Sequence, residues 1–432
     1  MFQALQNAFR LPDLRSKILF TLWILVVYRL AAHIPVPGVD QAALESFFQG
    51  NALGTLYNLL SGGALANFSV LAMGVYPYIT ASIIMQLLTP LVPQLEELSK
   101  EGESGRQKIN QYTYRLTVPL AFLQGLGQIA IMQQAQVFPS FGFNLVSAAT
   151  LMVLTAGSMF ACWLGELITE KGIGNGISII IFGGILAGAP TSLAQLWNRP
   201  AELMLFIGVM IVTVFVIVLI QQGERRVAVR YKRQVRGTKQ VGGQSNYVPL
   251  RVNASGMIPI IFAQAILIFP GLLAGYLAVA GNEGIAEFGR ITSQYFSPSS
   301  SVYWIFYFVM VVGFTYFYTD IIFRQQNLAE TLRRQGGVIE GFREGRPTAL
   351  YLQKVMMRIT FVGAIYLGLI AILAWLVSVV LIPFGIAVDT TGDSNFIVGS
   401  VGLLIVVGVV LDTMRQLEAQ LTMRHYERFI GR

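Results

Sequence analysis

Long apolar segments recur along the chain, separated by shorter segments that are rich in charged residues, glycine and proline. The stretch from Leu203 to Ile220 is typical, because it holds no charged residue and as a helix would nearly cross a hydrocarbon core of about 30 Å. Comparing each apolar run with its flanking charges predicts ten membrane-spanning helices, at roughly 17–34, 70–90, 115–134, 150–168, 175–189, 202–221, 256–278, 302–320, 358–382 and 396–414. The pattern therefore predicts an all-α polytopic membrane protein.

Lys and Arg residues gather on one side of this predicted arrangement. The N-terminus, the C-terminal tail and four connections carry 27 of the 30 Lys and Arg residues, and the connections are 91–115, 166–175, 222–255 and 321–358. They alternate with connections that carry almost none, so an omitted or invented helix would break the alternation. Because positively charged connections stay in the cytoplasm, we expect both termini and these basic segments on the cytoplasmic side.

The ten predicted helices divide evenly near Pro190 and Pro200. The division gives an N-terminal half, 1–190, and a C-terminal half, 191–432, of five helices each. Because five is odd, the two halves would enter the membrane in opposite directions, as in inverted-repeat transport proteins. We see no sequence similarity between the halves, so this symmetry is inferred from topology only.

The composition supports a membrane environment and narrows the chemistry. Hydrophobic residues make up 54% and charged residues 12% of the chain, whose mean hydropathy is +0.62, whereas soluble domains hold about 25% charged residues. A single cysteine, Cys162, allows no intrachain disulfide, and His33 and His425 are too distant in sequence to suggest a metal site. No glycine is followed by lysine, which excludes the Walker A loop, and no carboxylate pair falls at mid-span. We therefore expect no cofactor, no metal and no enzyme active site.

Three parts of the chain do not fit a plain helix bundle. The segment 54–69 is apolar but too short to cross a membrane, and is either an interfacial or re-entrant helix or a movable segment that fills a cavity. The segment from Gly172 to Gly188 begins with three glycines, which predicts an unwound helix start at the wall of a cavity. The loops 222–255 and 321–358 carry eight and seven Lys or Arg residues, more than orientation needs, which suggests a docking surface for ribosomal RNA, anionic lipid or an acidic protein.

The sequence resembles the SecY family, the channel subunits of the general protein-secretion translocon, over nearly its whole length. The resemblance rests on the motifs IPVPGVD (34–40), SGGALANFSVLAMGVYPYITASIIMQLL (61–88), EGESGRQKINQYT (101–113), WLGELITEKGIGNGISIIIF (163–182), YVPLRVNASGMIPIIFA (247–263) and GGVIEGFREGRPTALYL (336–352). It implies a clamshell of two halves around an hourglass pore, hinged between the fifth and sixth helices and opening sideways between the second and seventh. The implied function is a channel that translocates unfolded secretory polypeptides across the bacterial cytoplasmic membrane and releases transmembrane segments laterally into lipid.

The resemblance also assigns roles to individual residues. An aliphatic ring would form the pore constriction, since such side chains close by excluding water yet deform around a polypeptide; it comprises Val75, Ile79, Ile177, Ile181, Ile261 and Ile405. The valine departs from a ring of isoleucine alone. The segment 54–69 would be a plug on the outer side of the ring, with the residues Leu56, Tyr57, Leu59, Leu60, Leu65 and Asn67. The lateral gate would involve Thr80, Ser82, Gln86, Gln124, Met257 and Ile258.

The basic loops match the surface on which the family docks its motor and the ribosome. The arginines implied there are Arg225, Arg226, Arg233, Arg236, Arg251, Arg343 and Arg346. After Arg343, Glu344 replaces the proline that often stands there in the family. The implied partners are the small subunits SecE and SecG, the ATPase SecA, the translating ribosome, unfolded precursor polypeptides with their signal sequences, and anionic phospholipid.

Two other classes of function are compatible with topology alone. A secondary transporter for a small solute would also suit ten helices in inverted halves, but it should carry a polar or charged site at the middle of the membrane. A membrane-embedded enzyme would need a catalytic constellation, and the sequence offers none. Both alternatives lack the residues that their chemistry requires.

Overall fold

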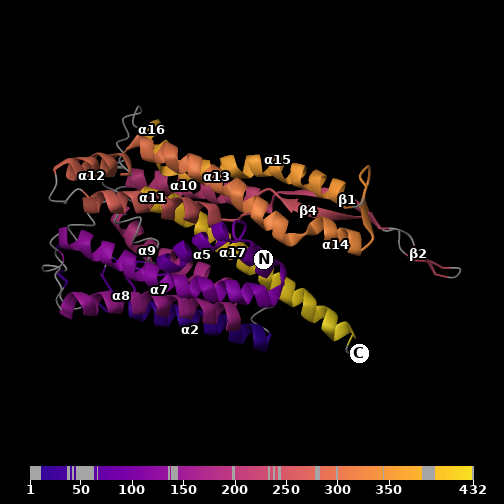
Figure 1. The fold of residues 1–432 in the computed structure, drawn as a ribbon, viewed down its shortest axis with the longest axis horizontal. Coiled ribbons are helices and arrows are strands. Elements are labelled where there is room, and N and C mark those ends of the chain that lie inside the picture. Colours follow the sequence, from indigo (N-terminus) through magenta and orange to yellow (C-terminus); the bar gives the residue numbers. More distant parts are fainter. Residues whose placement is uncertain are drawn as a thin grey trace.

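Figure 1 shows the computed structural model as long helices that run side by side along one axis, with strands projecting at one end. The structure describes residues 11–36, 39–40, 43–44, 63–65, 67–134, 137, 145–196, 200–231, 234–236, 239–241, 245–277, 283–297, 300–343, 345–381 and 395–430. Within these residues helices predominate, as the apolar runs predict.

The N-terminal half consists of helices. They are α2 (Pro12–Ala32), α5 (Tyr76–Leu88), α6 (Pro93–Lys100), α7 (Glu103–Gln134), α8 (Leu145–Lys171) and α9 (Gly176–Leu196). The axis turns by 98° between α5 and α6, where Pro90 and Pro93 interrupt the helical hydrogen bonds. α7 begins twelve residues before the predicted span at 115, so its first turns extend beyond the apolar segment.

The C-terminal half combines helices with short strands. Its helices are α10 (Pro200–Gln222), α11 (Ile258–Leu277), α12 (Glu283–Tyr295), α13 (Ser301–Gln326), α14 (Leu328–Arg334), α15 (Arg346–Ala371), α16 (Leu373–Leu381) and α17 (Asn395–Ile430). Its strands are β1 (Glu224–Tyr231), β2 (Gln234–Arg236), β3 (Lys239–Val241), β4 (Ser245–Arg251) and β5 (Gly337–Ile339).

A described helix lies at each of the ten predicted spans: α2, α5, α7 to α11, α13, α15 with α16, and α17. By length and composition alone, four helical stretches among the described residues are apolar enough to cross a membrane, and the bent pair of α5 and α6 makes a fifth. α2 is less apolar because Arg15, Lys17 and Arg29 flank its centre. The shorter apolar segments Gly176–Gly188 and Ile258–Leu267 belong to α9 and α11.

The two basic loops pair with each other in a small sheet that the sequence analysis missed, since it predicted only loops there. β1 runs antiparallel to β4, with Val227 opposite Val248, and to β5, with Val229 opposite Ile339. Alternate residues of β1 are buried, as expected for a strand with one covered face. The covered face packs in a separate hydrophobic cluster with Leu352 of α15. We call this sheet with α14 and the start of α15 the basic knob.

The two halves meet along two seams. α5 and α7 of the N-terminal half contact α11 of the C-terminal half, and we call this contact the α11 seam. On the other side α9 contacts α10 and α17, and we call this contact the α9 seam. One hydrophobic cluster includes buried residues from both halves, such as Ile79, Ile181, Ile261 and Ile405. The halves thus share one hydrophobic core.

Candidate functional site

The six aliphatic residues of the predicted ring come from four helices, two in each half. Val75 directly precedes α5, which carries Ile79; α9 carries Ile177 and Ile181; Ile261 lies on α11 and Ile405 on α17. Five of them are at most 8% exposed, and the sixth, Ile177, is partly buried against the same hydrophobic cluster. Side chains of this kind offer water and ions no hydrogen-bond partner.

Glycines fix the start of α9 and so the position of its two ring residues. Gly174 has φ +84°, a left-handed conformation that side chains rarely adopt. A Cβ on Gly176 would collide with the carbonyl oxygen of Gly165 on α8. The Asn175 side chain caps the helix, since its Oδ1 accepts a hydrogen bond from the Ser178 backbone nitrogen at 3.1 Å. The unwound start predicted from the glycines is therefore present.

Most of the predicted plug lies outside the described residues, including Leu56, Tyr57, Leu59 and Leu60. Of the other two plug residues, Leu65 is buried in the shared cluster and Asn67 is exposed. The chain that follows is tied to the segment after α2 by backbone hydrogen bonds, from Val36 N to Phe68 O at 3.1 Å and from Val70 N to Ile34 O at 3.0 Å. The end of the predicted plug is therefore anchored to the N-terminal half.

Arg29 of α2 is a residue that the plug prediction missed. Its Nη2 donates a hydrogen bond to the Gly184 carbonyl of α9 at 3.5 Å. Its Nη1 lies 3.4 Å from the place that a Cβ on Gly63 would occupy, beside the described end of the predicted plug. The available signal was an arginine inside an apolar run, because such a charge is rare unless it has a local partner.

The polar residues of the predicted lateral gate bond within their own half. Gln124 of α7 donates to the Thr80 hydroxyl of α5 at 3.2 Å, and Gln86 donates to the Ser82 hydroxyl at 3.1 Å. On the other side of the seam, Met257 packs near Gly408 of α17, and Ile258 is partly buried.

A hydrogen bond that crosses the α11 seam comes from a residue that the sequence analysis did not name. The Tyr76 hydroxyl of α5 donates to the Ala265 carbonyl of α11 at 2.9 Å, and Tyr76 is 3% exposed. A tyrosine in an apolar span was the available signal, because a buried tyrosine hydroxyl usually finds a partner. This bond lies beside the ring, one residue after Val75 and one helical turn after Ile261.

Four glutamines lie on the three helices of the α11 seam. Each leaves its side-chain oxygen buried without a hydrogen-bond partner among the described residues: Gln86, Gln124, Gln128 and Gln264. A buried polar atom without a partner costs about 1–3 kcal/mol. Each of these oxygens therefore makes the packing of the three helices less favourable than a paired atom would.

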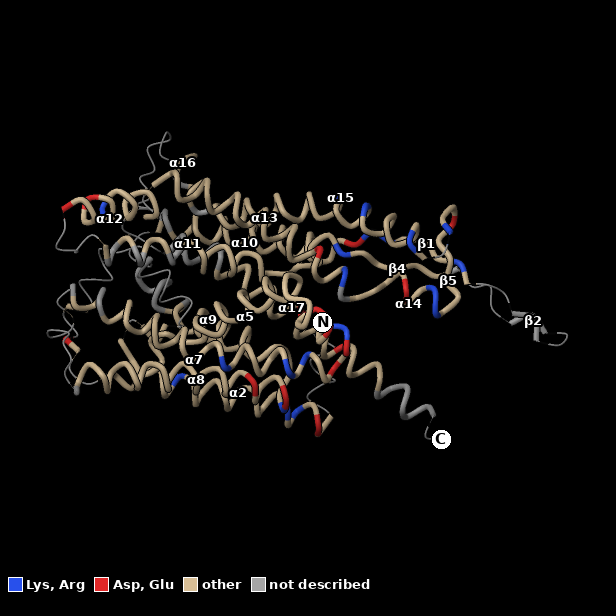
Figure 2. Tube along the Cα trace, viewed as in Figure 1, with Lys and Arg blue, Asp and Glu red and all other residues tan. Residues whose placement is uncertain are grey.

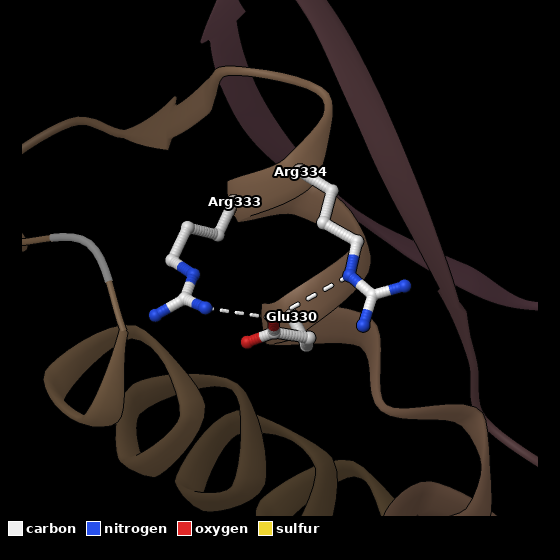
Figure 3. Close-up of polar contacts among 3 residues, drawn as sticks. All are labelled: Glu330, Arg333 and Arg334. Atoms are coloured by element: carbon white, nitrogen blue, oxygen red, sulfur yellow. Dashed lines mark hydrogen bonds and ion pairs between the residues drawn. The ribbon is translucent and has the colours of Figure 1, made fainter.

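The arginines of the predicted docking surface divide between two places. Arg225, Arg226, Arg343 and Arg346 are exposed on the basic knob, at the end of the molecule where Lys and Arg concentrate in Figure 2. The Glu224 carboxylate lies 2.8 Å from Arg226 Nε, and this hydrogen bond raises the pKa of Arg226. Figure 3 shows Arg333 and Arg334 of the knob's α14 sharing Glu330, at 2.8 and 3.5 Å. Arg233 lies outside the described residues, and for Arg236 only the backbone of β2 is described.

Arg251 lies apart from the other arginines. With Asp412 and Arg415 of α17 and Asn175 before α9, it lines a pocket of about 310 Å³. Arg415 pairs with Asp412 at 3.5 Å and donates to the Gln221 carbonyl of α10 at 2.8 Å. This pocket lies where α9, α10 and α17 meet, at the knob end of the bundle.

The apolar helices, the hydrophobic cluster shared by the two halves and the basic knob are features of a polytopic membrane protein. The SecY family model matches residues 69–414. The chain belongs to the SecY family, and as a member it is a multi-pass membrane channel for protein translocation, as the resemblance predicted.

Relatives and solved structures agree with this assignment. The chain is 41% identical to the protein translocase subunit SecY of Streptomyces galbus and 42% identical to that of Halalkalibacterium halodurans, each over 100% of both chains. It is 40% identical to the Thermotoga maritima subunit over 100% of this chain and 98% of the relative. A solved protein-conducting channel has the same fold, with a TM-score of 0.64 at 19% identity over 94% of this chain and 92% of that one. Sec61 in the canine ribosome-channel complex gives a TM-score of 0.61 at 18% identity, with the same coverage of 94% and 92%.

Proposed function

We propose that the ring of Val75, Ile79, Ile177, Ile181, Ile261 and Ile405 is the constriction through which unfolded polypeptides cross. The observation that carries this proposal is that these residues come from both halves and that five of them belong to one hydrophobic cluster, against which Ile177 packs. An apolar ring stops ions when its members touch, and it gives way to a polypeptide without binding it. The proposed role is conduction rather than catalysis, and the energy for transport comes from a partner.

A site-specific crosslink tests the constriction. Cys162 is the chain's only cysteine, so a C162A background allows one cysteine to be placed at Ile79. We expect a precursor stalled during transport to crosslink there. Val362, 56% exposed on α15, is the matched control position and should give no precursor crosslink. Crosslinking at Val362 but not at Ile79 would contradict the proposed path.

The segment 54–69 is proposed to seal the resting pore from the outer side. Support comes from its described end, where Leu65 packs in the shared cluster and the next residues are anchored to 34–36. We expect deletion of residues 56–67, or I79G with I181G, to raise ion conductance of reconstituted vesicles. Conductance equal to that of the unaltered protein would exclude the seal.

The α11 seam is proposed as the lateral gate that releases apolar segments into lipid, with Thr80, Ser82, Gln86, Gln124, Met257 and Ile258 along it. Two features support this role. The hydrogen bond that crosses the seam, from Tyr76 to Ala265, is of a kind that averages only about 0.6 kcal/mol within membranes, and the helices of the seam carry buried glutamine oxygens without a partner among the described residues. A seam held in this way parts at low cost when a segment of a precursor competes for its surfaces.

The basic knob is proposed to dock the ATPase SecA and the translating ribosome, in a complex with SecE and SecG. Exposed Arg225, Arg226, Arg343 and Arg346 support a partner with an acidic surface. We propose the same docking role for Arg233 and Arg236. Arg251 would contact a partner at the mouth of the pore instead. Support also comes from neighbours of the same fold whose structures are ribosome-bound.

A charge reversal tests the docking. R343E should lower SecA-driven transport without reducing insertion of the channel into membranes. R290E is the matched control, because Arg290 is exposed on α12 at the opposite end of the molecule (Figure 1). Equal loss of transport in both variants would contradict docking at the knob.

The proposed location is the bacterial cytoplasmic membrane, with both termini and the knob in the cytoplasm. The one-sided distribution of Lys and Arg supports this orientation. The resemblance further supports anionic phospholipid as a partner. Protease added outside intact cells should therefore leave the knob uncut.

A further inference from the structure

A groove of about 660 Å³ runs between α13 and α15, and the function described so far does not use it. One wall is Tyr316 of α13. The floor is a stripe on α15 whose members recur every three or four residues and so share one face: Leu350, Gln353, Lys354, Met357, Arg358 and Phe361. Leu350 is 57% and Phe361 56% exposed, so this face of α15 is covered by nothing else in the described chain.

The groove crosses the level at which the membrane interface is expected. Gln353 donates a hydrogen bond to Asp320 of α13 at 3.1 Å, which places these two residues at one depth. Asp320 also pairs with Arg324 at 2.7 Å, and such charges mark the end of the apolar part of α13. At 1.5 Å per residue, Arg358 lies roughly 8 Å and Phe361 roughly 12 Å deeper than Gln353. The groove therefore begins at the interface and continues along apolar surface.

Two basic side chains line this groove without an acidic partner among the described residues. Lys354 and Arg358 are one helical turn apart and both exposed, and neither forms an ion pair within the described part of the chain. Asp320, the acidic residue bonded to Gln353 at the start of the groove, is also paired with Arg324. A charge at this depth is unfavourable unless it reaches water or meets an opposite charge.

We propose that the groove binds one anionic phospholipid. Its phosphate lies between Lys354 and Arg358, while its acyl chains run over Met357 and Phe361. A free phosphate ion would use only the two cations, and an acidic protein face would leave the deeper apolar floor uncovered. A diacyl lipid with a negative headgroup matches both parts. The inference rests on the proposed partnership with anionic phospholipid and assigns it a site.

Photocrosslinking tests the site on the complete channel complex in vesicles, without precursor or ATP. The probe is phosphatidylglycerol with a photoactivatable group in one acyl chain. We expect crosslinks on the peptide 346–361, none from the matching phosphatidylcholine probe, and no competition by millimolar inorganic phosphate. Equal labelling by phosphatidylcholine, competition by phosphate, or crosslinks only elsewhere on the chain would overturn the proposal.

A charge-neutral variant sharpens the test. K354Q with R358Q should lower retention of phosphatidylglycerol by about thirtyfold, since each basic residue near an anionic headgroup contributes about fivefold. The matched control, R333Q with R334Q, removes the same charge from the knob and should retain the lipid. Unchanged retention in the first variant would overturn the site.

Transport assayed separately keeps this inference distinct from the proposed channel role. Normal precursor transport with no crosslink at 346–361 would reject only the lipid site. Crosslinking as expected, with a channel that moves no precursor, would reject only the proposed transport role.

Discussion

The α9 seam and the α11 seam join the same two halves by different means. At the α9 seam the chain passes from α9 to α10 between Leu196 and Pro200, and α17 packs closely against the turn before α9. A Cβ on Gly174 would lie 2.9 Å from Ile179 Cδ1 and 3.1 Å from Thr413 Oγ1 of α17. At the α11 seam α5 and α7 pack against α11, and the Tyr76 hydroxyl donates a hydrogen bond to the Ala265 carbonyl across it.

This difference indicates which seam opens. Separating α9 from α17 would lose the close van der Waals contacts around Gly174. The short connection from α9 to α10 also keeps the two halves close together at this seam. The helices of the α11 seam carry buried glutamine oxygens without a partner among the described residues, and such atoms would gain partners if water or another polypeptide entered. We therefore propose that motion about the α9 seam opens the α11 seam, which is the clamshell motion that the resemblance implies.

The largest effect is expected at the α9 seam, for G174V. A left-handed conformation costs an L-residue about 1–2 kcal/mol, and overpacking costs about 1–3 kcal/mol more. We expect the unfolding temperature of the purified protein to fall by several degrees and transport to be lost.

The matched control is G313V on α13, because a Cβ at Gly313 meets nothing within 4 Å and Gly313 has no positive φ. This variant should keep the unfolding temperature of the unaltered protein. An equal fall of the unfolding temperature in both variants would contradict the prediction, because the loss of stability would then not come from close packing at Gly174.

An effect of opposite sign is expected at the α11 seam for Q264M. Gln264 is 1% exposed and its Oε1 has no partner among the described residues, so a methionine of similar shape removes the cost of burying that oxygen. The closed form should gain about 1–3 kcal/mol, visible as a higher unfolding temperature and slower precursor transport. Q107M, at an exposed position on α7, should change neither; faster transport by Q264M would contradict a gate weakened by unpaired amides.

Local sequence patterns account well for the bundle. Apolar runs are local features, so each predicted span coincides with a helix, although charged first turns hid the true starts of α7 and α15. The glycines before α9 predict the unwound turn for the same reason. The ring residues were named through the resemblance, and the structure buries or partly buries all six.

Non-local pairings account for what was missed. β1 and β5 pair although more than a hundred residues separate them, and the separation between Tyr76 and Ala265 is 189 residues. Charge counts likewise grouped Arg251 with the arginines of the basic surface. In the structure Arg251 lies at the end of β4 and lines the pocket beside α17. A periodicity reports which face of an element is buried, whereas the partner of that face depends on the whole chain.

The smallest effect is expected for Y76F, which tests whether the hydrogen bond of the Tyr76 hydroxyl, rather than its burial, stabilises the α11 seam. Y76F removes the hydrogen bond to Ala265 and keeps the aromatic side chain. The contact between α5 and α11 should therefore lose about 0.6–1 kcal/mol. Y307F is the matched control, because the Tyr307 hydroxyl of α13 is buried without a partner among the described residues and its loss should be neutral or stabilising. Resting ion conductance and transport of precursors with weak signal sequences should both rise in Y76F alone. If the two variants behave alike, the hydroxyl of Tyr76 does not hold the seam, and its closure depends on apolar contact between α5 and α11.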